Sequence, residues 1–193
     1  DLPYTQHHFL ERNDTTKKFY GIIPIEFSAS MLYFHHKGIV QNLIHNLKYK
    51  NHQEVGSLLG KWYAKDLETV SQIQTVSEII PVPLHKKRLE ERGYNQVTTF
   101  CEALSNELKI PYNPDLLYRS RYSKTQTKKD KENRKDIANS LFDVNFTEAD
   151  HNKHFLLVDD VMTSGATLES CAKALLKIPN SKVSVVTIAY TLS

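Results

Sequence analysis

Two adjacent acids, followed by a short turn with hydroxyls and a glycine, are the residues of this sequence best suited to chemistry. The run is FLLVDDVMTSGAT over residues 155–167, with Asp159 and Asp160 after four apolar residues. Backbone N–H groups in a turn that leads into a helix form an anion site, and Gly165 lets the backbone approach a phosphate closely. Paired carboxylates accept hydrogen bonds from vicinal ribose hydroxyls. The run therefore predicts a ribose 5-phosphate site, with the acids on the 2′- and 3′-hydroxyls. The expected contacts in the turn are Val161, Met162, Thr163, Ser164, Gly165, Ala166 and Thr167.

A plainer interpretation of this run is a strand-to-helix turn whose acids are solvated and whose Thr163, Ser164 or Thr167 caps the helix. A response-regulator receiver domain also places an acid pair after a strand. Only 33 residues follow Asp160, which is too few for the rest of such a domain. The acids, the glycine and the hydroxyls together favour the ribose-phosphate interpretation.

A second candidate segment joins prolines to a cluster of cations. Its sequence is IPVPLHKKRLEERGYNQ over residues 80–96. The prolines stiffen the exit from a strand, and four cations within residues 86–92 can bind a multiply charged anion. Arg88 and Arg92 are four residues apart and share one face if the segment is helical. The alternative is a solvated basic loop, with Asn95 as a helix N-cap. The candidate contacts are Val82, Pro83, Leu84, Lys86, Lys87, Arg88, Arg92, Asn95 and Gln96.

A third segment, residues 119–135, holds eight Lys or Arg against two Asp or Glu in a chain whose net charge is +3. The basicity is therefore local, and the chain is not a uniformly basic nucleic-acid binder. A mobile cationic loop suits a reaction that releases an anionic leaving group. A solvated charge run and a contact with single-stranded DNA are the alternatives. Tyr122 is the one aromatic residue in the cluster, and stacking platforms usually need more.

The elements that must position these segments follow from apolar periodicity. The spacing predicts helices over residues 39–47, 53–69, 97–108 and 168–178. Apolar runs predict strands within residues 22–34 and at 76–83, 115–118, 155–158 and 183–190. Their alternation predicts an α/β fold with a mainly parallel sheet and helices on both faces. Ligands of such sheets bind at the carboxyl ends of the strands. Residues 1–20 form a polar, irregular segment, and residues 21–193 form one domain.

The run VDDVMTSGAT at residues 158–167 resembles the phosphoribosyl pyrophosphate motif of type I phosphoribosyltransferases. Residues 80–96 and the segment LIHNLKYK at residues 43–50 are similar to the ComF family of phosphoribosyltransferase-like proteins, and the resemblance runs from Gly21 onward. It implies a type I phosphoribosyltransferase fold with a flexible basic loop. It also implies phosphoribosyl pyrophosphate and Mg²⁺ as ligands, and transfer of phosphoribose to a nitrogen nucleophile.

The same resemblance assigns roles to residues. Asp159 and Asp160 would be catalytic and would lie at the metal, and the strand exit at residues 82–84 would contact pyrophosphate. Thr125, Gln126 and Arg134 match the family's catalytic loop. The acceptor is not indicated, because residues 1–50 contain no base-reading pattern that we recognise.

The ComF family is associated with DNA uptake in competent bacteria and is often labelled amidophosphoribosyltransferase-like. The resemblance therefore leaves a second function open, a non-catalytic module that handles single-stranded DNA or binds competence proteins. Relatives commonly carry an N-terminal zinc ribbon. No CxxC occurs here, so zinc is expected only if such a ribbon lies upstream. An oligomer is compatible with the sequence.

Other features of the sequence exclude function classes. No apolar run reaches the length of a membrane span, and the polar start does not resemble a signal peptide. Cys101 and Cys171 lie on apolar helix stripes, which predicts buried free thiols and fits the cytoplasm. The run GSLLGK at residues 56–61 is too short for a phosphate-binding P-loop and follows a helical pattern. The paired histidines at 7–8 and 35–36 are expected on the surface, whereas His151 and His154 flank the key strand and are weaker metal-ligand candidates.

Overall fold

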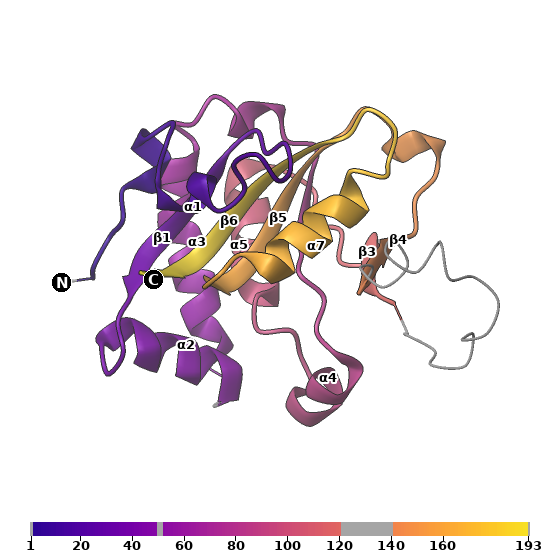
Figure 1. Ribbon diagram of the computed structural model, residues 1–193. Coiled ribbons are helices and arrows are strands. Elements are labelled where there is room, and N and C mark those ends of the chain that lie inside the picture. The colour runs from indigo at the N-terminus through magenta and orange to yellow at the C-terminus, as the bar shows by residue number, and fades with distance from the viewer. Residues whose placement is uncertain (1, 50–51, 121–140, 193) are drawn as a thin grey trace.

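A four-stranded parallel sheet forms the centre of the protein in a computed structural model, which describes residues 2–49, 52–120 and 141–192 (Figure 1). The strand order is β1-β6-β5-β2, and each neighbouring pair is parallel. The four strands are β1 (Ser28–Phe34), β2 (Glu78–Pro81), β5 (His154–Met162) and β6 (Lys182–Thr191). A separate antiparallel pair consists of β3 (Leu117–Arg119) and β4 (Phe142–Val144).

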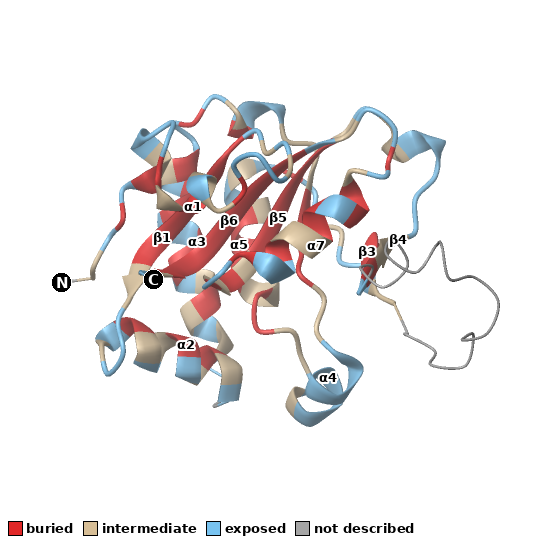
Figure 2. Ribbon diagram, viewed as in Figure 1, coloured by how far each residue is buried: buried red, intermediate tan, exposed pale blue. Residues whose placement is uncertain are grey.

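Helices cover both faces of this sheet, which confirms the predicted fold class. The longer helices are α2 (Ile39–Tyr49), α3 (Gln53–Leu67), α4 (Lys86–Arg92), α5 (Thr98–Leu108) and α7 (Ala166–Leu175). One apolar core joins α2, α3 and α5 to the sheet, and a second joins α7 and the β3–β4 pair to its other side. Figure 2 shows the strands as a buried layer between the helices.

The apolar residues of β5 show how one strand serves both cores. Phe155 and Leu157 belong to the core beneath α7, whereas Leu156 and Val158 belong to the core beneath α3 and α5. Successive side chains of a strand point to opposite faces, so a strand that is covered on both sides needs a continuous apolar run. This is why residues 155–158 are all apolar and do not alternate with polar residues, as they would in a strand with one face in water.

Close contact between α3 and α5 explains the glycines of the GSLLGK run. A Cβ atom on Gly60 would lie 2.6 Å from the Cβ of Ala103 and 2.7 Å from the carbonyl oxygen of Phe100. One on Gly56 would lie 2.2 Å from Thr99 Oγ1. The run therefore lies within a helix, as expected, and its glycines allow two helices to approach.

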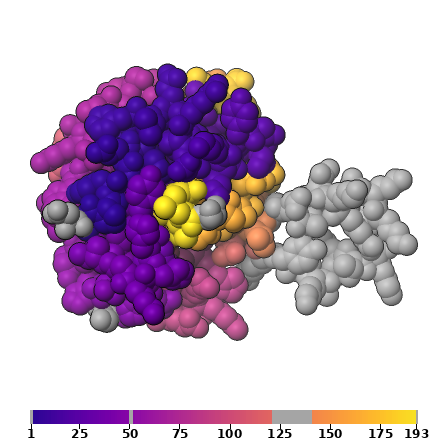
Figure 3. All heavy atoms as spheres, turned by 60° about the vertical axis from the view of Figure 1, so that its left-hand side comes forward, coloured from indigo at the N-terminus to yellow at the C-terminus, as the bar shows by residue number. Residues whose placement is uncertain are grey.

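The N-terminal segment is more ordered than its polar composition indicated. It contains the 3-10 turn η1 (His7–Phe9) and the short helix α1 (Asp14–Lys17), which begins with a capping box at Asn13. Phe19 is buried in the core beneath α7, and Asn13 Nδ2 donates to the Ser28 carbonyl over 2.8 Å. These contacts join the segment to β1 and to the core beneath α7. Figure 3 shows the N-terminal residues, in indigo, lying together on the surface of the molecule.

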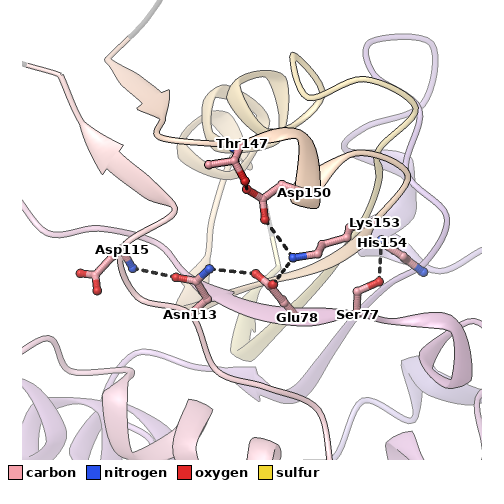
Figure 4. Close-up of polar contacts among 8 residues, drawn as sticks. All are labelled: Ser77, Glu78, Asn113, Asp115, Thr147, Asp150, Lys153 and His154. Carbon is pink, nitrogen blue, oxygen red and sulfur yellow. Dashed lines mark hydrogen bonds and ion pairs between the residues drawn. The ribbon is translucent and has the colours of Figure 1, made fainter.

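A polar cluster ties the amino ends of β2 and β5 together (Figure 4). Lys153 Nζ lies 2.8 Å from Asp150 Oδ1 and also bonds Glu78, whose other oxygen accepts from Asn113 Nδ2 over 2.9 Å. Asn113 precedes β3, and Asp150 follows β4. The cluster thus anchors both chain segments that lead to the β3–β4 pair.

In the described part of the chain, no helix is long and apolar enough to cross a membrane.

Candidate functional site at the carboxyl edge of the sheet

The sequence predicted that the strand ends at Val158, before the two acids. In the structure, β5 continues through both acids to Met162. It pairs with β6 as far as Met162, opposite Tyr190, because β6 continues alongside it to Thr191. The turn at residues 163–165 then leads directly into α7. The acid pair is therefore held by strand pairing, and the hydroxyl-bearing turn lies at the carboxyl edge of the sheet, where it was expected.

The turn after β5 forms a small hollow of about 50 Å³ lined by Asp159 and by residues 161–168. Gly165 has φ +85°, a left-handed backbone conformation that favours glycine. It is also the N-cap of α7 and makes no side-chain cap hydrogen bond. Of the expected capping residues, Ser164 accepts with its Oγ from the N–H of Ala166, the first residue of α7, over 3.4 Å, although the N-cap position itself is Gly165. The start of α7 presents backbone donors and the positive end of its dipole at the hollow.

The two acids lie in different electrostatic surroundings. Asp160 is 5% exposed, and its Oδ2 lies 2.6 Å from Lys48 Nζ of α2. Burial, and after it the negative charge of Asp160, raises the pKa of Asp159 well above its ordinary value. Asp160 is thus compensated by a cation, whereas Asp159 holds a proton more readily than an exposed aspartate does.

A second hollow, of about 280 Å³, adjoins this ion pair and is rich in cations. Arg92 donates from Nη1 to Gln96 Oε1 over 2.6 Å, and its guanidinium carbon lies 5.0 Å from the centre of the Tyr49 ring. Arg88 and Arg92 both line the hollow, so the shared face predicted for them is confirmed. The lining residues are Lys48, Tyr49, Arg88, Glu91, Arg92 and Tyr94.

Two lysines of the proline–basic segment do not line this hollow. The ammonium of Lys86 lies 3.6 Å from Glu90 on the exposed side of α4. Lys87 is exposed as well. Of the four cations expected to bind one anion, the structure therefore places two around this hollow.

Asn95 connects the strand exit to α5 and is not its N-cap, which is Val97. Its Nδ2 donates to the Val82 carbonyl over 2.9 Å, and its Oδ1 accepts from the Val97 N–H over 3.2 Å. The chain after β2 is thereby fixed where it passes the site, because one side chain binds both segments. Pro83 and Leu84 follow directly and are half-buried.

Thr125, Gln126 and Arg134 lie outside the described residues, and so does most of the basic segment. Arg119, at its start, lies in β3 with its guanidinium carbon 5.1 Å from the centre of the Phe142 ring. The sequence reasoning missed Lys48, Tyr49 and Tyr94. The signal was present: residues 43–50 were cited only for the family resemblance, and Tyr94 lies within the candidate segment 80–96 but was not among its expected contacts.

Metal-binding clusters of three or more His, Cys, Asp or Glu are absent from the described ranges. His154 bonds Thr75 Oγ1 through Nδ1 and Ser184 Oγ through Nε2, both over 2.8 Å, so its ring nitrogens are occupied. The surface position expected for His7 is wrong: the ring is 1% exposed and lies edge-on to Tyr33 and Tyr190. Cys101 and Cys171 are buried free thiols, as predicted.

Comparison with known proteins gives a family and a fold. A family model described as "Phosphoribosyl transferase domain" matches residues 98–193, which include the acid pair and the turn. The chain is 29% identical over 153 residues to the DNA utilization protein YhgH of Shigella flexneri, a match covering 78% of this chain and 66% of that protein. It is 32% identical over 99 residues to the competence protein ComFC of Bacillus subtilis, covering 51% and 38%.

A solved structure with low sequence identity to this chain supports the same fold. The glutamine phosphoribosylpyrophosphate amidotransferase of B. subtilis superimposes with a TM-score of 0.51 at 15% identity, over 75% of this chain and 30% of that one. The shared arrangement is the type I phosphoribosyltransferase fold.

Proposed function

Because this chain belongs to the type I phosphoribosyltransferase-like family, we propose that it binds phosphoribosyl pyrophosphate with Mg²⁺ and transfers the phosphoribosyl group to a nitrogen nucleophile. One observation carries the proposal: Asp159 lines the hollow at the turn, while the neighbouring Asp160 is paired with Lys48, which lines the cationic hollow. The proposed ligand has the same order of groups, a phosphate, a vicinal diol and a diphosphate.

Each part of the ligand has a counterpart in the site. The 5-phosphate would accept hydrogen bonds from the backbone of residues 163–167 at the start of α7. The ribose hydroxyls would donate to Asp159 and Asp160. The diphosphate would extend past residues 82–84 toward Arg88 and Arg92, whose guanidinium groups suit phosphate oxygens.

The reaction breaks the bond between C1 of the ribose and the diphosphate oxygen, and pyrophosphate leaves with the electron pair. A bond forms between C1 and the acceptor nitrogen, which gives up one proton. The contribution of the chain is to orient the ligand and to stabilise the negative charge that develops on pyrophosphate. We assign no general base among the described residues.

Two carboxylates are enough for a magnesium ion that arrives with its ligand. Magnesium is usually held by one or two carboxylates together with substrate phosphates, and Asp159 and Asp160 supply the protein part of such a set. When bound, the ion would neutralise charge on the diphosphate.

Calorimetry with phosphoribosyl pyrophosphate and Mg²⁺ tests this function. We expect saturable binding that Asp159→Asn weakens at least tenfold and that Glu148→Gln leaves unchanged, because Glu148 is exposed on η3 (Glu148–Asp150), near the amino ends of the strands. An absence of binding at millimolar ligand would refute the proposal. A screen of purines, pyrimidines and ammonia for pyrophosphate release would then identify the acceptor.

A second function is favoured by the names of the relatives, which refer to DNA utilization and competence. In this alternative the same fold handles single-stranded DNA and performs no transfer. It predicts DNA binding whose affinity falls steeply with salt concentration, since released counterions drive such binding. Unchanged DNA affinity after charge reversal at Lys128, Lys129 and Lys131 would exclude a role for the basic segment.

A further inference from the structure

Asp160, which the proposed ligand would need as a hydrogen-bond acceptor, is already paired with Lys48 in the structure. Lys48 Nζ lies 2.6 Å from Asp160 Oδ2, and the two side chains are 25% and 7% exposed. Removing one partner of a buried pair leaves an uncompensated charge, so Asp160 keeps Lys48 until another positive or hydrogen-bonding group replaces it.

Lys48 also lines the cationic hollow, together with Arg88 and Arg92. It stands near the end of α2, and a flexible four-carbon stem carries its ammonium group. A single cation therefore borders both the acid pair and the hollow. The other two cations come from α4, and Arg92 is held by Gln96. Among the three described Lys and Arg side chains that line this hollow, Lys48 is the one that is paired with an acid of the site.

We propose that Lys48 is a positioning residue that changes partners. In the ligand-free protein it compensates Asp160, and it turns to the diphosphate when the ribose hydroxyls and the cation carried by the ligand occupy Asp160. This inference rests on the proposed function and adds a residue to it. It also makes the two ends of the ligand dependent on each other, because the diphosphate gains Lys48 only when Asp160 releases it.

Such an exchange predicts a measurable coupling between two half-ligands. Coupling between sites is reciprocal, so each half-ligand must raise the affinity of the other by the same factor. A Lys48 that only holds α2 against the sheet would give a different result. Its removal would then lower stability and weaken both half-ligands without changing the coupling factor.

The experiment measures the binding of 1,4-anhydroribitol 5-phosphate and of Mg²⁺-pyrophosphate by calorimetry, each alone and each with the other present. The first compound carries the diol and the phosphate but has no hydroxyl group at C1, so pyrophosphate has room beside it. We expect the wild-type protein to show a coupling of roughly tenfold, within the range of ordinary coupling energies. Lys48→Met should reduce the factor to about one, and Lys48→Arg should restore part of it.

Two further variants keep the test decisive. Lys61→Met removes an exposed lysine of α3 that lines neither hollow, and its coupling should equal that of the wild type. If Lys48→Met does not fold, the double variant Lys48→Met/Asp160→Asn removes both charges and should also lack coupling. Coupling in Lys48→Met, or in the double variant, that equals the wild-type coupling would overturn the inference. Failure of both half-ligands to bind the wild-type protein would instead refute the proposed function itself.

Discussion

At the residue level, Gly165 determines the shape of the turn between β5 and α7. Its φ of +85° lets the chain leave β5 and begin α7 at once, and a Cβ atom at this position would lie 3.4 Å from the Cβ of Lys18 in the N-terminal segment. Residues with a Cβ atom adopt this conformation at a cost of about 1–2 kcal/mol. The turn therefore depends on one residue type at one position.

Gly165→Ala should lower the free energy of unfolding by about 1 kcal/mol and weaken phosphoribosyl pyrophosphate binding at least tenfold, because strain at this position displaces the backbone donors. Urea unfolding and calorimetry would measure the two effects. Gly21→Ala is the matched control. Gly21 also has positive φ, at +73°, but it lines neither hollow, so this variant should lose stability and keep binding. Equal loss of binding in both variants would contradict the prediction.

At the level of elements, the contact between α3 and α5 supports the face of the sheet to which Leu156 and Val158 point. The two helices approach through Gly56 and Gly60, which leave no room for a methyl group. These glycines lie in a run that looks locally like a phosphate-binding loop. Their role is instead set by the neighbouring helix.

Gly60→Ala should destabilise the protein by about 1–3 kcal/mol, the usual cost of an overfilled core. Alanine favours helices over glycine by about 1 kcal/mol, so a helix without a close neighbour would gain stability. At Gly60 the clash with Ala103 and the Phe100 carbonyl outweighs this gain, so the free energy of unfolding should fall. Urea unfolding measures the change, with Lys61→Ala as an exposed control on the same helix. A stabilised Gly60→Ala variant would show that α3 and α5 do not approach as described.

For the whole molecule, two buried histidines, each in contact with other parts of the fold, should make the stability depend on pH. His154 joins the start of β5 to Thr75 and Ser184, and His7 anchors the N-terminal segment against Tyr33 and Tyr190. Burial is the largest cause that lowers the pKa of each below 6.5. Both rings are thus neutral in the folded protein at a pH where they are charged in the unfolded chain.

Stability should therefore be complete above pH 6.5 and decline as the pH falls below it, because the unfolded chain then binds more protons. Urea unfolding at pH 7.5 and pH 5.5 measures the decline. In His154→Gln the difference between the two pH values should be smaller than in the wild type, while the exposed His35→Gln should match the wild type. An identical decline in all three proteins would mean that His154 does not contribute.

The sequence by itself determined the alternation of strands and helices, the buried thiols, and the position of the acid pair and its turn at the carboxyl edge of the sheet. These follow from periodicity and turn composition within about a dozen neighbouring residues, where local sterics and burial dominate. The same local reasoning did not find the burial of His7 or the backbone bond of Asn95 to Val82.

Only the tertiary structure decided which distant side chains meet. Lys48 and Asp160 are far apart in the chain, and neither has a local feature that marks the other as its partner. Their contact exists because α2 packs on the face of the sheet to which Asp160 points. The acid pair was therefore visible in the sequence, whereas the cation that compensates it was not, since an ion pair depends on distance in space and not on separation along the chain.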